Sequence, residues 1–126
     1  MKKEIIVQLN KTFEESAYTQ NGVEYWMARD IQKLLDYTEW RNFSLVVDKA
    51  KIACMKSGQN IGDHFVDVNK TIPMPKGAEK DIQDIMLTRY ACYLIAQNGD
   101  PRKEQIAFAQ SYFAIQTRRQ ELLEEH

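Results

Sequence analysis

The residues best suited to chemistry in this chain are basic and amide side chains around a predicted pair of helices, 28–36 and 39–56. A very short turn joins these helices, as in a helix-turn-helix, whose second helix enters the major groove of DNA. Side chains that could reach base edges stand at the start of that second helix: Trp40, Arg41, Asn42 and Ser44. Cations that could neutralise phosphates lie around them: Arg29, Lys33 and Lys49. The alternative is structural, with Trp40 packed on a neighbouring hairpin and the cations on a solvated face.

Further cations lie in the C-terminal part of the chain. Arg89 opens a predicted helix over 89–98, and helix N-termini bind anions through their free backbone N–H groups. Thr88 could satisfy those donors itself, which would leave Arg89 as a salt-bridge residue. A second group consists of Arg102, Lys103, Arg118 and Arg119. The last two could contact phosphate or a partner, but glutamates follow them directly, and ion pairing at helix spacing is the simpler explanation.

The sequence gives little indication of a catalytic or metal-binding site. An enzyme needs a nucleophile with a base, paired carboxylates in a pocket, or a metal. His64 has no catalytic partner visible in the sequence, and Asp81 and Asp84 fall in polar sequence and are interpreted as solvated charges. Cys54 and Cys92 lie in apolar helical sequence, which favours small buried thiols. The cysteines and histidines lack metal-ligand spacing, so we expect no enzyme, metal or cofactor.

Size and charge restrict the class of protein. The chain has 126 residues, which suits one globular domain, and its formal net charge is −1. Since dedicated DNA-binding domains are usually basic, any nucleic-acid contact must come from a local patch. The apolar runs are too short to span a bilayer, and the basic start of the chain is not followed by a hydrophobic segment. We therefore expect a cytoplasmic protein with no membrane association.

The hydrophobic pattern predicts a mostly helical α+β domain with a small antiparallel β element. Apolar spacing indicates helices, and Asn-Gly between β-type residues indicates a hairpin. The expected helices are 2–15, 28–36, 39–56, 89–98 and 101–124, with a strand starting at 5–7 as the alternative for the first of them. The expected strands are 17–19, 23–26, 65–68, 71–74 and 84–87. Thr38 is a candidate N-cap for the helix over 39–56, and the segment 76–80 is expected to be the most exposed part of the chain.

Four successive residues, 98–101, predict a break between the last two helices. Asn98 and Gly99 predict a left-handed stop for the first helix, because glycine adopts positive φ without a side-chain penalty. Asp100 is then expected as an N-cap and Pro101 at the first helical position. The apolar residues of the final helix cover more than one stripe, so this helix either packs centrally or meets a partner, for example a second copy in a homodimer.

Several short sequence motifs in the chain resemble those of one known family. They include Tyr25-Trp26, Ala28-Arg29, Leu34-Leu35, Asp63-His64-Phe65, Arg89-Tyr90-Ala91-Cys92-Tyr93-Leu94, Gln97-Asn98-Gly99-Asp100-Pro101 and the run 112–122. This pattern resembles the DNA-damage-inducible protein D family, whose N-terminal part is a Bro-type (BRO-N) domain. The resemblance implies a Bro-N-like domain over 13–126 that ends in a long helix. It leaves 1–12 as an N-terminal extension, expected to be helical.

The resemblance also implies a function. It predicts a non-enzymatic bacterial regulator of the SOS response to DNA damage that binds DNA or a recombinase–DNA filament in the cytoplasm, at the nucleoid. Members of this family carry a further C-terminal half without a counterpart here, so activities that need that half are not implied. The alternative is a protein-interaction or dimerisation module, such as a prophage antirepressor fragment.

Overall fold

The segments with helical apolar spacing form five α-helices in the computed structural model, which describes residues 2–124. The helices are α1 Lys2–Glu15, α2 Ala28–Leu34, α3 Trp40–Lys56, α4 Arg89–Asn98 and α5 Glu104–Glu124. Two short 3₁₀ turns, Ile61–Asp63 and Pro75–Gly77, lie between α3 and α4. The described helices include none long and apolar enough to cross a membrane.

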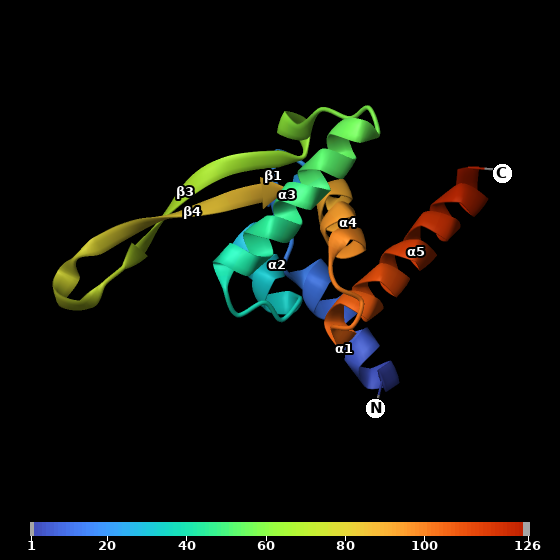
Figure 1. Cartoon of the computed structure of the whole chain (residues 1–126), viewed down its shortest axis with the longest axis horizontal. Coiled ribbons are helices and arrows are strands. Elements are labelled where there is room, and N and C mark those ends of the chain that lie inside the picture. Colours follow the sequence, from blue (N-terminus) through green and yellow to red (C-terminus); the bar gives the residue numbers. More distant parts are fainter. Residues whose placement is uncertain (1, 125–126) are drawn as a thin grey trace.

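An antiparallel sheet accompanies the helices. Its strands are β1 Tyr18–Gln20, β2 Val23–Met27, β3 Phe65–Pro73 and β4 Glu79–Leu87, in the order β1-β2-β4-β3. β1 and β2 form the hairpin predicted around Asn21 and Gly22, both of which have positive φ. β3 and β4 pair along their whole length, and their outer part extends away from the helices (Figure 1). The α+β class predicted from the sequence is confirmed.

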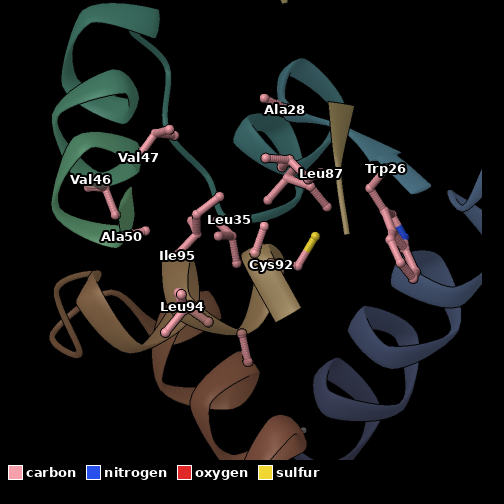
Figure 2. Close-up of a cluster of buried hydrophobic side chains, with 14 of the residues drawn as sticks. Trp26, Ala28, Leu35, Val46, Val47, Ala50, Leu87, Cys92, Leu94 and Ile95 are labelled. Atoms are coloured by element: carbon pink, nitrogen blue, oxygen red, sulfur yellow. The ribbon is translucent and has the colours of Figure 1, made fainter. Parts of the chain in front are cut away.

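The core lies where the helices meet the base of the sheet. Trp26, Leu87 and Ile95 have no exposed surface, and Figure 2 shows Ile95 of α4 in one cluster with Leu87 and Trp26. α4 is buried along most of its length because α3, α5 and the sheet all pack against it. Cys54 and Cys92 are buried free thiols, as expected, and burial raises the pKa of both. This core fixes the ends of α2, α3 and β4 relative to one another.

The helix α1 belongs to this core. Leu9 and Phe13 are buried, and the Phe13 ring stacks on Trp26 with 4.6 Å between ring centroids. The segment predicted as a helical extension is therefore helical, and α1 runs without a break across the boundary placed at residues 12 and 13. Ile5 and Ile6 share the helical spacing of Leu9 and Phe13 in the sequence, and their side chains lie outside the described residues.

Two predictions about α3 and the second hairpin are wrong in detail. Thr38 does not cap α3: Glu39 stands at the N-cap position, and no side chain accepts a hydrogen bond there. β3 is one continuous strand, and β4 begins at Glu79 instead of residue 84. The outer part of β4 was not predicted, because neither face of these pairs is wholly apolar: Thr71 lies opposite Asp81, and Ile72 opposite Lys80.

The break before α5 also differs from its prediction. Gly99 has φ −79°, which is not left-handed. A side chain there would force Ile106 to shift, since a Cβ atom would lie 2.5 Å from Cδ1 of Ile106. Asp100 accepts a hydrogen bond from the backbone N–H of Arg102 at 2.9 Å, so it closes a turn that contains Pro101. α5 begins only at Glu104.

The second half of α5 projects away from the other elements (Figure 1). Ile106, Ala109 and Phe113 are buried in its first half. Beyond them, Ile115 and Leu123 are more than half exposed. The wide apolar surface predicted for this helix is therefore divided: one part packs in the core, and the other faces outward.

Candidate nucleic-acid interface

Arg29 joins three elements at the centre of the predicted site. It lies in the first turn of α2, and its guanidinium carbon is 4.0 Å from the ring centroid of Trp40 at the start of α3. Its Nε donates a hydrogen bond of 2.9 Å to the carbonyl oxygen of Gln83 on β4. The starts of α2 and α3 are thus fixed beside the point where the outer β3–β4 hairpin leaves the core.

Asp84 also holds β4 against the first turn of α2. Its side chain is fully buried, and Oδ1 accepts hydrogen bonds from the backbone N–H groups of Arg29 at 3.0 Å and Ile85 at 2.8 Å. A carboxylate at a helix N-terminus is favoured by the helix dipole. The interpretation of Asp84 as a solvated charge is wrong, because the chain folds β4 against the first turn of α2. Asp84 therefore attaches the hairpin to the helix pair.

The exposed side of α3 carries the predicted contact residues. Arg41, Asn42 and Lys49 are exposed, and Lys33 is exposed at the last turn of α2. Large apolar side chains lie on the same side of α3: Leu45 and Met55 are each 57% exposed, and Ile52 is 50% exposed. Acidic Glu39 stands at the N-cap of α3 and acidic Asp48 lies on the same side of the helix, so this surface carries charges of both signs. The exposed side of α3 therefore combines polar, charged and apolar side chains.

Trp40 has a structural role in this surface. The centroid of its ring lies 5.9 Å from the ring centroid of Phe43, and the guanidinium of Arg29 covers one face of the ring. A cation over a tryptophan face is stabilised by the ring quadrupole and is held in one position. Trp40 is half-buried, which leaves part of the ring accessible at the start of α3.

Arg89 belongs to a different cluster. Its guanidinium binds Glu14 of α1 through two hydrogen bonds, of 2.9 and 2.7 Å, and Glu24 of β2 at 2.9 and 3.3 Å. Hydrogen bonding to Glu14 raises the pKa of Arg89, and the same bonding lowers the pKa of Glu14. Tyr112 of α5 donates a hydrogen bond to Glu14 as well. Thr88 caps α4 through the backbone N–H of Ala91 at 3.1 Å, as predicted.

The remaining predicted cations lie on or before α5. Arg102 pairs with Asp100 at 2.8 Å, and Lys103 donates a hydrogen bond of 3.0 Å to the carbonyl oxygen of Asp36. Arg118 is exposed on α5, and the side chain of Arg119 lies outside the described residues. The structure thus brings Arg29, Lys33, Trp40, Arg41, Asn42 and Lys49 onto neighbouring helices α2 and α3.

His64 has a structural environment. Its Nδ1 lies 2.7 Å from Oγ1 of Thr88, and its ring packs on Tyr90 with 4.8 Å between centroids. Within residues 2–124, no cluster of His, Cys, Asp and Glu side chains could hold a metal ion. Because Thr88 also caps α4, the contacts of His64 with Thr88 and Tyr90 hold the start of α4 in place.

Sequence reasoning missed two parts of this surface. Gln83 and Asp84 were not recognised as the anchor of Arg29, and the lysines of the outer hairpin were not assigned to it. Alternation offered a signal for the hairpin, since Lys70 and Ile72, and likewise Lys80 and Ile82, are two residues apart in sequence and share one face of the paired strands. The anchor depends on residues 55 positions apart, for which the sequence gives no local signal.

Comparison with known proteins identifies the class of this domain. The family described as "BRO family, N-terminal domain" matches residues 15–114, so the chain belongs to the BRO family. A curated relative, "DNA damage-inducible protein D" of Escherichia coli (strain K12), is 49% identical over 117 residues. The match covers 92% of this chain and 43% of the relative, so the chain spans less than half of the relative's length. No solved structure matches. The family resemblance predicted from the sequence is confirmed.

Proposed function

We propose that this chain is a DNA-binding module of the DNA-damage response. Its membership of the BRO family and its similarity to a protein named for DNA-damage induction support this function. The observation that carries it is the start of α3, where exposed Arg41 and Asn42 stand next to the Arg29–Trp40 stack. Helix-turn-helix proteins likewise present exposed polar side chains at the start of a fixed helix to a major groove.

Each residue has a distinct role in this proposal. Arg41 and Asn42 contact base edges, for which guanidinium and amide groups are suited. Lys33 and Lys49 neutralise phosphates on the two sides of the groove. Arg29 donates to Gln83 and stacks on Trp40, so it holds the helix start in place and acts as a positioning residue.

Exchange of two lysines tests this interface. K33Q/K49Q should lower the magnitude of the slope of log affinity against log salt by about 1.8, because each phosphate contact contributes about 0.9. K3Q/K11Q removes the same charge from α1 and should leave the slope unchanged. Fluorescence anisotropy on duplex and on single-stranded DNA measures both variants. Equal slopes for K33Q/K49Q and the native chain would place the interface elsewhere.

A finer proposal concerns the target. We propose a non-enzymatic, cytoplasmic regulator of the SOS response that binds at the nucleoid and acts on recombinase–DNA filaments. This proposal rests on the family resemblance. Filament assembly on single-stranded DNA, followed by light scattering, should change in rate or extent when the chain is added. Unchanged assembly at saturating chain concentration would remove this part of the proposal.

One observation favours a second function, a dimerisation or protein-interaction module like an antirepressor fragment. Ile115, Leu122 and Leu123 are exposed on the projecting half of α5, at 58%, 41% and 71%. Apolar residues gathered on an exposed helix commonly mark contact with a partner. Sedimentation equilibrium separates the two functions, because a homodimer through α5 should weaken with dilution and dissociate in the I115E variant.

A further inference from the structure

The outer β3–β4 hairpin, residues 69–83, separates its charges between two faces. We call it the arm. In the cross-strand register Lys70 lies opposite Ile82, and Ile72 opposite Lys80. Because side chains alternate between faces, these four share one face, which we call the lysine face. Thr71 opposite Asp81 and Pro73 opposite Glu79 occupy the other face, so the acids of the arm all lie there.

The arm has the dimensions of a groove-binding ribbon. Its five residue pairs beyond Val68 span about 17 Å at roughly 3.4 Å per residue, and its strands lie about 4.8 Å apart. The major groove of B-DNA is about 12 Å wide and admits a two-stranded ribbon, whereas the minor groove is about half as wide. The arm residues are mostly exposed, and the arm extends from the body (Figure 1).

The base of the arm is fixed beside α3. Arg29 donates to Gln83 of the arm and stacks on Trp40, and Asp84 binds the first turn of α2. DNA held at the start of α3 would therefore meet the arm at a defined orientation. A two-stranded hairpin on its own is only marginally stable in water. Because the anchorage already restricts the arm, less conformational entropy is lost when the arm binds DNA.

We propose that the arm enters the major groove of duplex DNA next to α3 with its lysine face inward. This inference rests on the proposed function and adds a second contact to it. Lys70 of β3 and Lys80 of β4 extend towards the phosphates on opposite sides of the groove, while Ile72 and Ile82 contact thymine methyl groups. The acidic side chains Asp81 and Glu79 face solvent. Charge complementarity favours an anionic partner over an apolar one, and the width of the arm favours a DNA groove over an acidic protein surface.

The K70Q/K80Q variant tests the arm without shortening it. Its slope of log duplex affinity against log salt should be smaller in magnitude by about 1.8, the value for two phosphate contacts. K3Q/K11Q, with the same change in charge on α1, should keep the native slope. A second variant replaces residues 70–82 by Asn-Gly, a turn that closes a two-residue hairpin after Asn69. It should lose protection of guanine N7 from methylation at one end of the footprint only.

The outcomes separate this inference from the proposed function. If K33Q/K49Q reduces the slope and K70Q/K80Q does not, the arm inference is overturned and the α3 interface stands. If the native chain binds no duplex at low salt, both are overturned. If K70Q/K80Q and the shortened variant act as described, and both keep the native helical signal in circular dichroism, the arm is a DNA contact.

Discussion

Replacing Arg89 by alanine should lower the free energy of unfolding by about 2–4 kcal/mol while DNA affinity of the folded chain stays the same. Arg89 ties α4 to Glu14 of α1 and Glu24 of β2 through two ion pairs. Its guanidinium also lies 5.0 Å from the ring centroid of Trp26. These contacts are internal to the domain, so the arginine acts on stability and not on phosphate binding.

The magnitude follows from the geometry of these contacts. Hydrogen bonds to charged groups contribute about 1.5–3 kcal/mol when buried, but fully exposed ion pairs contribute about 0–1 kcal/mol. The Arg89 side chain is 35% exposed and its partners 42% and 47%, so each pair lies between these limits at about 1 kcal/mol. The cation–π contact adds about 0.5–1 kcal/mol, and two carboxylates left without their cation account for the rest.

Urea unfolding followed by circular dichroism measures this loss, and anisotropy on duplex DNA measures binding below the transition. Arg102→Ala is the matched control, because it breaks an ion pair whose arginine is 89% exposed and should leave the free energy of unfolding unchanged. A double-mutant cycle of Arg89→Ala with Glu14→Ala should show coupling of about 1–2 kcal/mol. Native stability with weakened DNA binding in Arg89→Ala would refute the structural role.

Three other predictions concern single positions. Gly99→Ala should destabilise the chain by about 1–3 kcal/mol in urea unfolding, because its Cβ would lie 2.5 Å from Cδ1 of Ile106; a neutral effect would contradict the close approach. Asp84→Asn should cost about 1–3 kcal/mol, since it buries an amide where Oδ2 has no hydrogen-bond partner among the described residues. Burial, and then hydrogen bonding to Glu14, raises the pKa of Tyr112 to about 12. Phenolate absorbance should show this shift, and stability should fall as pH rises from 10 towards 12.

Local patterns predicted the helices well because their signals lie within a few residues. The apolar stripe of Phe43, Val47 and Cys54 defines α3, and Thr88 caps α4 as its position suggests. Helix periodicity and capping depend on neighbours three or four residues apart, and both can be read from sequence. The Asn21-Gly22 turn belongs to the same class of signal.

Features that depend on distant residues escaped prediction. Gly99 is required by Ile106 in the next helix and not by its own backbone angle. Asp84 is buried because β4 packs on α2. The two elements touch although Arg29 of α2 precedes Asp84 by more than 50 residues in sequence. The outer hairpin has polar residues on one face and lysine and isoleucine on the other, so hydrophobic patterning alone did not extend the strands.

The measurement that tests the central claim most directly is the salt dependence of duplex DNA binding by the native chain. If Lys33, Lys49, Lys70 and Lys80 each neutralise one phosphate, log affinity should fall against log salt with a slope of about −3.6, at roughly −0.9 for each contact. A slope near zero, or no binding at low salt, would contradict the proposal that α3 and the arm form a nucleic-acid interface.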